Sequence, residues 1–278
     1  MESAMSIFQV DAFTKQPFSG NPAAVVPLTQ WIGDDLMQRI AMENNLSETA
    51  FFVPVAQNVA RSPALAGSES SAHFHIRWFT PSVEVNLCGH ATLATAYVIF
   101  NELGFTGEEI IFQSQSGRLS VTREADGKLT MDLPSWPPVR LPEYPESLIT
   151  ALNREILGVY QYRDLLVELE DEATVRSLQP DFKVLQQLGQ SIIVTAPGLK
   201  ADFVSRFFAP NLGIDEDPVT GSAHTQLIPF WGEKLRKKQL YAKQLSKRGG
   251  ELWCTWMGDR VRISGHCAFF LKGAISVK

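Results

Sequence analysis

Two carboxylates stand in sequence patterns that could support proton transfer. Glu48 lies in the segment 44–51 (NNLSETAF), at the entry to a strand predicted over 49–53. Asp217 lies in the segment 216–222 (EDPVTGS), directly before a predicted helix start. A positioned carboxylate can act as a general acid or base, but a glutamate at a strand edge is usually solvated and an aspartate before a helix usually caps it. These segments alone indicate acid–base chemistry without establishing it.

Motifs of several large enzyme classes are missing from the sequence. It contains no GxGxxG, P-loop, GxSxG or HExxH pattern, which removes the usual sequence support for dinucleotide enzymes, nucleoside triphosphatases, α/β-hydrolases and zincins. His73 and His75 share one face of a predicted strand and could bind a metal. A packed or solvated pair is the more ordinary interpretation, because no third ligand lies nearby in the sequence. His224 and His266 have no assigned role.

A short motif, called the cassette below, occurs twice in the sequence. This repeat predicts that the chain consists of two copies of one half. Residues 77–81 (RWFTP) lead to 89–92 (GHAT), and residues 206–210 (RFFAP) lead to 221–225 (GSAHT). The offsets of 129 residues between the arginines and 132 between the glycines are each near half of the 278-residue chain. Each cassette predicts a strand, a loop and a glycine that opens an apolar helix. Helix starts can hold a carboxylate or phosphate, so two of them facing one cleft would form a substrate site.

Composition restricts the class of protein. A 278-residue chain that is 45% hydrophobic can bury a substantial core in two ordinary domains or one large one. The net charge of −5 argues against a general nucleic-acid binder, and the basic run 234–248 is expected to be a solvated helix end and loop. Three cysteines without a CxxC pair fit a reducing cytoplasm. The start lacks the pattern of a signal peptide, and the longest apolar run, 91–100, is too short to span a membrane.

Predicted strands outnumber predicted helices and most are joined by short hairpins, so the expected fold class is α+β with mostly antiparallel sheets. The segment 91–103 is apolar all round a helix, which predicts burial on every side, as a surrounding sheet would provide. A boundary near Ser116 would give domains 1–116 and 117–266, with a strand at about 267–278 completing the first. Further helices are predicted over 34–44, 145–157 and 222–235 (kinked at Pro229), a loop over 57–71, and strands over 6–13, 23–26, 49–53, 73–79, 118–124, 128–133, 165–169, 251–257, 260–264 and 268–271.

Five motifs in succession resemble those of the PhzF family of phenazine-biosynthesis-like proteins, and the match runs essentially end to end. They are 11–14 (DAFT), 20–23 (GNPA), 45–51 (NLSETAF), 87–92 (LCGHAT) and 216–223 (EDPVTGSA). Within the family, the chain most resembles the phenazine-biosynthesis-like-domain proteins of unsettled substrate, through 77–81 (RWFTP) and 248–252 (RGGEL).

The resemblance implies a diaminopimelate-epimerase-like fold, in which two similar domains each curl a sheet around a central helix and the active site lies in the cleft between them. It implies a cofactor-independent, metal-free isomerase or epimerase that moves a proton on a small carboxylate-bearing substrate, and a homodimer. The implied catalytic residues are Glu48 as the proton-shuttling carboxylate, His90, Asp217 and Ser222. The implied substrate contacts are Asn21, Ser47, Gly89 and Gly221.

Two alternatives stay open. Related racemases of this fold use one cysteine from each domain, and Cys88 occupies the first of these places. Because segment 217–220 (DPVT) contains no second cysteine, Cys88 is more simply a small buried residue, with a reactive thiol as the alternative. The protein could also be a catalytically silent scaffold, although its four implied catalytic positions are all intact.

Overall fold

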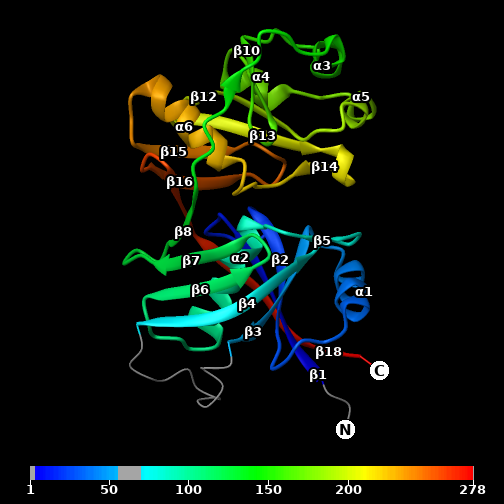
Figure 1. Ribbon diagram of the computed structural model, residues 1–278, viewed down its shortest axis with the longest axis vertical. Helices are drawn as coiled ribbons and strands as arrows, with labels where there is room; N and C mark the ends of the chain where they lie inside the picture. Colours follow the sequence, from blue (N-terminus) through cyan, green and yellow to red (C-terminus); the bar gives the residue numbers. More distant parts are fainter. Residues whose placement is uncertain (1–3, 56–69, 278) are drawn as a thin grey trace. The chain divides into compact units, whose positions relative to one another are not determined.

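The computed structural model describes residues 4–55 and 70–277, and the chain divides into two compact units. Unit 1 comprises Met1–Asp132 together with Ser264–Lys278, and unit 2 comprises Leu133–Ile263 (Figure 1). The chain therefore leaves unit 1 once and returns to it at its end.

The units divide at Asp132 rather than at the predicted Ser116. Ser116 lies in the tight turn between β6 (Glu109–Ser114) and β7 (Gly117–Arg123), and these two strands pair antiparallel along their whole length. A boundary inside this hairpin would separate strands that share a ladder. The loop predicted over 57–71 falls almost wholly outside the described residues.

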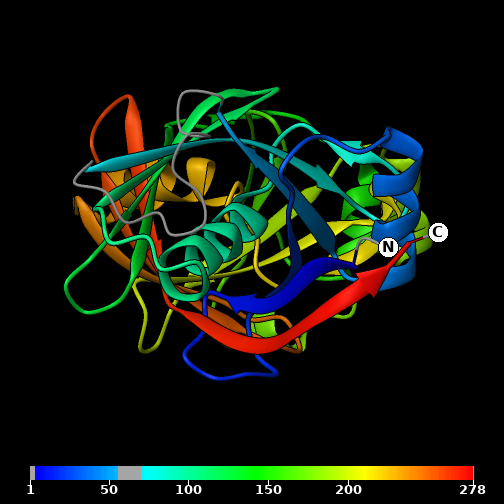
Figure 2. The same ribbon diagram turned by 90° about the horizontal axis from the view of Figure 1, so that it is seen from below.

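Unit 1 is one mixed sheet in which each strand pairs with the next in the order β18, β1, β2, β3, β4, β6, β7, β8. The β2/β3 and β4/β6 pairs are parallel and the others antiparallel. The first and last strands lie side by side, with Ala4 opposite Ser276 (Figure 2). The remaining strands are β1 (Ala4–Ala12), β2 (Asn21–Pro27), β3 (Glu48–Pro54), β4 (Ser71–Phe79), β5 (Glu84–Val85), β8 (Leu129–Pro134) and β18 (Cys267–Ser276).

Unit 2 repeats this arrangement, which confirms the predicted duplication. In unit 1, β1/β2, β3/β4 and β6/β7 are antiparallel, β2/β3 and β4/β6 are parallel, and the helix α2 (Gly89–Tyr97) lies between β4 and β6 in the chain. In unit 2, β10/β11, β12/β13 and β15/β16 are antiparallel, β11/β12 and β13/β15 are parallel, and α6 takes the place of α2. Its strands are β9 (Val139–Arg140), β10 (Gly158–Gln161), β11 (Leu165–Glu168), β12 (Ile192–Pro197), β13 (Phe203–Ala209), β14 (Ile214–Asp217), β15 (Gln239–Gln244), β16 (Gly250–Trp256) and β17 (Arg260–Gly265).

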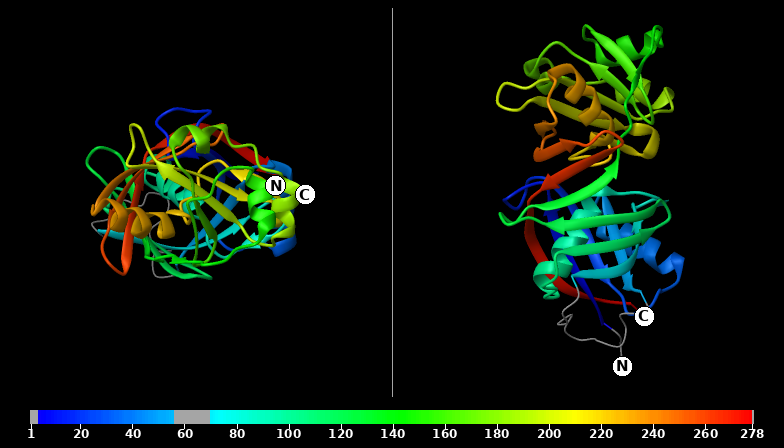
Figure 3. Two further views of the ribbon diagram at one scale, coloured as in Figure 1. Left: turned by 90° about the horizontal axis from the view of Figure 1, so that it is seen from above. Right: turned by 60° about the vertical axis from the view of Figure 1, so that its left-hand side comes forward.

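Each unit has one central helix that is buried on all sides. In α2 (Gly89–Tyr97), every residue from Gly89 to Ala96 is buried, and the chain continues through a π-helical turn at Val98–Glu102. In α6 (His224–Leu235), every residue from His224 to Gly232 is buried. The helix α6 is drawn in orange in Figure 3. Small and apolar side chains all round α2 allow strands to approach from every direction, as the sequence predicted. In the part of the chain that the structure describes, no helix is long and apolar enough to cross a membrane.

Further helices cover the outer faces of the two sheets, so strands between two layers are buried on both faces. In unit 1, α1 (Asp34–Asn44) packs Met37 and Ile40 against Val26 and Phe51. In unit 2, the outer layer shares a core with β10 to β13 and consists of α3 (Glu146–Leu152), α4 (Glu172–Ser177) and α5 (Phe182–Gln187).

Two predictions of local structure are wrong. The helix predicted over 145–157 ends at Leu152, because Asn153 adopts a left-handed φ of 46°. The basic run 234–248 is not only a helix end and loop, because it contains β15. Alternate residues of β15 are buried, so its pattern is that of a half-buried strand whose outward positions are Gln239, Tyr241 and Lys243.

Candidate active site

In unit 1, the end of α1 and the start of β3 position Glu48. Asn45 closes α1 with a left-handed φ of 48° and donates its N–H to the carbonyl of Ala41, which turns the chain towards β3. Glu48 is the first residue of β3, opposite Ala23 in the parallel β2/β3 pair. Asn21 begins β2, so it emerges at the same end of the sheet as Glu48.

A directed chain of polar contacts links four of the predicted site residues. The Ser47 hydroxyl donates to Asn21 Oδ1 at 3.1 Å, and Asn21 Nδ2 donates to His90 Nδ1 at 3.1 Å. An amide nitrogen can only donate, so His90 Nδ1 accepts and the ring proton lies on Nε2. His90 Nε2 is 3.0 Å from Glu48 Oε2, and the two side chains are only 4% and 13% exposed. The structure thus brings together Asn21, Ser47, Glu48 and His90, with His90 on the first turn of α2 next to Gly89.

The facing atoms of Glu48 and His90 are close without being well paired. The 3.0 Å separation meets an ion-pair distance, but the geometry is not that of a hydrogen bond, and neither atom has a hydrogen-bond partner among the described residues. Buried polar atoms are nearly always hydrogen-bonded in folded proteins. An unpaired carboxylate oxygen beside an unpaired ring N–H is therefore an arrangement that can exchange a proton with a ligand.

Charge and burial act in opposite directions on this cluster. Burial, the largest influence, lowers the pKa of His90, and the carboxylate of Glu48, 3.0 Å from Nε2, raises it. Burial, followed by the charge of Glu48, raises the pKa of the Cys88 thiol to about 11. Cys88 therefore carries its proton at neutral pH, which fits a packing role better than that of a reactive thiolate.

One group of side chains within the described residues lies close enough together to hold a metal ion. It consists of Glu48, Cys88 and His90. The donor set is unfavourable, because Cys88 Sγ faces His90 Nδ1 at 3.5 Å whereas Glu48 faces Nε2. The cysteine would also have to lose its proton. His75 is exposed on β4, and His73 lies 3.5 Å from the Ser71 hydroxyl.

Replacing Cys88 with Ala should leave catalysis within about threefold of the wild type, because a protonated buried thiol is a poor base. Iodoacetamide at pH 8 should label Cys88 far more slowly than a free thiol. Mass spectrometry of the labelled peptide and kinetics of the variant check both expectations. Rapid labelling together with loss of activity would assign Cys88 a chemical role.

In unit 2, Asp217 and Gly221 lie in a loop that is held by hydrogen bonds to a buried glutamine. Asp217 ends β14, and its carboxylate accepts a hydrogen bond of 2.5 Å from the Thr220 hydroxyl. Gln244, which ends β15, donates to the backbone carbonyl of Asp217 and accepts from the backbone N–H of Thr220, both at 2.8 Å. Ser222 follows Gly221 in the turn that leads into α6. The predicted residues of this half therefore also occupy one fixed loop.

Two arginine–glutamate clamps hold the loops that precede the central helices. Arg77 pairs with both carboxylate oxygens of Glu84 at 2.7 Å, and Arg206 pairs with both oxygens of Glu216 at 2.7 and 2.9 Å. Sequence reasoning singled out the arginines but missed the role of their partners. The signal was present, since each glutamate stands five residues before the glycine of its cassette.

His224 has a structural role that the cassette repeat explains. It stands three residues after Gly221, as Thr92 stands three residues after Gly89. The Thr92 hydroxyl donates to the backbone carbonyl four residues earlier at 2.6 Å, and His224 Nδ1 donates to the carbonyl of Thr220 at 2.9 Å. Burial lowers the pKa of His224 to about 4, so the ring is neutral in the folded protein.

This burial predicts a loss of stability in mild acid. Below pH 6.5 the unfolded chain binds a proton at His224 that the folded chain accepts only near pH 4, so the free energy of unfolding should fall by about 2–3 kcal/mol across that interval. His224→Thr copies the other half and cannot titrate. Urea denaturation at pH 7 and pH 4.5 should show a smaller decrease in this variant, and equal decreases would contradict the assignment.

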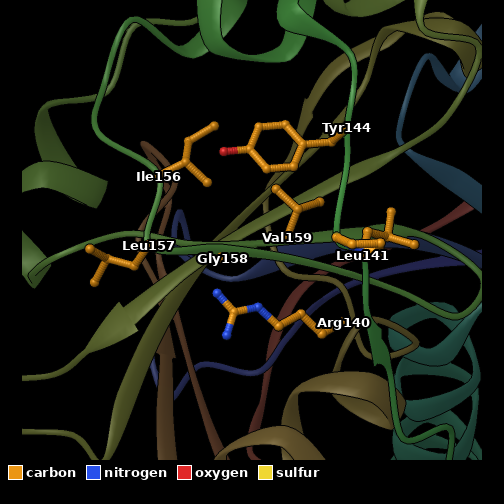
Figure 4. A pocket seen from close by; sticks show the side chains of 8 residues that line it. Arg140, Leu141, Tyr144, Ile156, Leu157, Gly158 and Val159 are labelled. Atoms are coloured by element: carbon orange, nitrogen blue, oxygen red, sulfur yellow. The ribbon is translucent and has the colours of Figure 1, made fainter.

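A pocket of about 550 Å³ in unit 2 contains none of the predicted site residues (Figure 4). It lies beside β9 and β10, and its walls are mainly aliphatic with one guanidinium and one phenol. It contains no carboxylate, histidine or cysteine, so it lacks the carboxylate–histidine pair seen in unit 1. The lining residues are Arg140, Leu141, Pro142, Tyr144, Ile156, Leu157, Gly158 and Val159.

Comparison with known proteins identifies the family. A family model described as phenazine biosynthesis-like protein, PhzC-PhzF, matches residues 10–273, nearly the whole chain. The chain belongs to the PhzC-PhzF family. An uncharacterized isomerase of Pseudomonas aeruginosa is 50% identical to this PhzC-PhzF protein over 273 residues, which cover 98% of each chain.

Solved structures confirm the fold. The crystal structure of a PhzF-family protein from Enterococcus faecalis is 44% identical, covers 99% of this PhzC-PhzF chain and 100% of its own, and has a TM-score of 0.90. A hydroxyproline epimerase from Agrobacterium vitis has a TM-score of 0.63 at 9% identity, covering 100% of this chain and 94% of its own, which shows a shared fold. The predicted family and the α+β fold with two pseudo-symmetric domains are confirmed, and the chain has relatives that are named isomerases.

Proposed function

We propose that this protein is a cofactor-independent isomerase that moves a proton on a small carboxylate-bearing substrate. The observation that carries the proposal is the pair formed by Glu48 Oε2 and His90 Nε2, which are buried, 3.0 Å apart and without hydrogen-bond partners among the described residues. The isomerase names of its relatives support the same reaction class.

The chemistry follows from what these side chains can hold and release. Glu48 as carboxylate takes a proton from carbon, and the electron pair of the broken C–H bond spreads into the adjacent unsaturated or carboxyl group of the substrate. His90, whose ring proton faces Glu48, stabilises the carboxylate before the transfer. Return of the proton to another carbon gives isomerisation, and its return to the opposite face of the same carbon gives epimerisation.

Residues of unit 2 would bind the substrate and provide a second acid–base group. Ser222 and the backbone at Gly221 and Gly89 would bind the acidic group of the substrate, and Asp217, fixed by Thr220, would assist the transfer. A carboxylate is a weak base towards a C–H bond, so the reaction needs the substrate to be held out of water. The homodimer and the cytoplasmic location stay predictions.

The competing function is a silent scaffold, and binding followed by proton exchange separates the two. A panel of small carboxylic acids should include at least one that raises the melting temperature, because a ligand that binds only the folded state stabilises it. That acid should then exchange a C–H proton with solvent. A panel in which several acids bind and none exchanges would favour the scaffold.

A further inference from the structure

We propose that Arg163 binds a second anionic group of the substrate, so that the enzyme prefers acids carrying two anionic groups over acids carrying one. This inference rests on the proposed function, because it assumes that Ser222 faces the substrate. Arg163 lies in the turn between β10 and β11, and no sequence motif pointed to it.

The guanidinium of Arg163 is held in place on three sides. Its Nε donates to Asp164 at 3.1 Å, its Nη2 donates to the Ser222 hydroxyl oxygen at 3.1 Å, and its Cζ lies over the Trp136 ring, 5.5 Å from the ring centre. Trp136 is itself stacked on Tyr162. Nη1 has no partner among the described residues, and the side chain is 40% exposed. A fixed guanidinium with an unused edge is suited to bidentate recognition of a carboxylate or phosphate.

Buried contacts tie this arginine to α6. Gln226, fully buried in α6, accepts from the backbone N–H of Arg163 at 3.2 Å and donates to Asp164 at 3.3 Å. The backbone N–H of Trp136 donates to the carbonyl of Thr225 at 2.9 Å. The position of the guanidinium is thus set before any ligand arrives, which lowers the entropic cost of binding.

The duplication of the two units suggests a role for Arg163. In unit 1, the hairpin β1–β2 supplies Asn21, which contacts His90, the residue after the glycine of the first cassette. In unit 2, the equivalent hairpin β10–β11 supplies Arg163, which contacts Ser222, the residue after the glycine of the second cassette. Arg163 is therefore the counterpart of an implied substrate contact, with a cation in place of a neutral amide.

Calorimetric titration with two unreactive planar acids tests the inference. Benzoate carries one carboxylate and isophthalate carries two on the same ring. The wild type should bind isophthalate more tightly than benzoate. Arg163→Gln should weaken isophthalate by about 10–100-fold and benzoate by less than about threefold, and Arg163→Lys should recover part of the loss. Arg154→Gln is the matched control, because that arginine, also in unit 2, is partly exposed and donates to the carbonyl of the neighbouring Asn153 rather than to a predicted site residue.

Three results would overturn the inference: no preference for isophthalate in the wild type, no effect of Arg163→Gln, or equal losses for both acids. Equal losses would mean that Arg163 acts only by positioning Ser222. Glu48→Gln should keep the isophthalate preference, since it removes the base and not the binding site. Arg163-dependent binding in a protein without proton exchange would therefore overturn the proposed isomerase and leave the Arg163 site intact, and the reverse pattern would do the opposite.

Discussion

Glu48→Gln should reduce turnover and solvent proton exchange by about 10²–10⁴-fold, the usual contribution of a positioned general acid–base group. Glutamine keeps the size of the side chain but cannot take a proton. Its amide can still lie against His90, so the protein should fold and bind acids normally. Steady-state kinetics on an acid found in the binding panel, with melting temperature measured in parallel, checks both parts of this expectation.

A second carboxylate provides the matched control for this experiment. Glu43 is exposed on α1, a few residues before Glu48, so Glu43→Gln removes the same charge without touching the His90 pair. It should leave turnover unchanged. If Glu48→Gln were as active as Glu43→Gln, the base would have to be another group, with Asp217 and then Cys88 next to be tested.

Arg206→Met should destabilise the protein by about 3 kcal/mol. Arg206 is only 11% exposed and holds both oxygens of Glu216. It also donates to the backbone carbonyls of Val175 and Leu178 at 3.2 and 2.6 Å. Its loss leaves a half-buried carboxylate and two backbone carbonyls without their donor. Removing one partner of a buried ion pair is strongly destabilising, because the remaining charge stays buried without compensation.

The control for Arg206 is an ion pair of the same chemistry on the surface. Arg176 and Glu172 are four residues apart on α4, and Arg176 is 61% exposed. Arg176→Met should cost less than about 1 kcal/mol in urea denaturation. Similar losses in the two variants would show that the Arg206 clamp contributes no more than a surface pair. Because Glu216 adjoins Asp217, Arg206→Met should also lower turnover.

Local patterns predicted the central helices and the duplication well. A helix with small and apolar residues on every side is stable only where every side is buried, as it is inside a curled sheet. The helix α2 is buried in this way. The repeat of Arg and Gly at matching offsets depends only on chain order, so sequence alone revealed it. Glu48, Asn21, Ser47 and His90 were implied by the resemblance to a known family, and the structure places them in contact.

Features that depend on distant contacts were not predictable in this way. Arg163 stands 59 residues before Ser222 in the sequence, and their contact arises from the pairing of β10 and β11 beside α6. The boundary near Ser116 was misplaced because the segment 113–117 (QSQSG) resembles a linker, and only strand pairing shows it to be the turn of a hairpin. The strand β15 was missed because it lies within a basic run, where Lys243 occupies one of the outward positions between its buried residues.

Deuterium incorporation tests the central claim most directly. The wild-type protein, free of added metal and cofactor, is incubated in D₂O with each acid that raises its melting temperature, and the C–H signals are followed by proton NMR. The account predicts that at least one acid gains a single deuterium at the reacting carbon, at a rate that falls about 10²–10⁴-fold in Glu48→Gln. Acids that bind yet keep every C–H signal, or exchange that is as fast in Glu48→Gln as in the wild type, would contradict it.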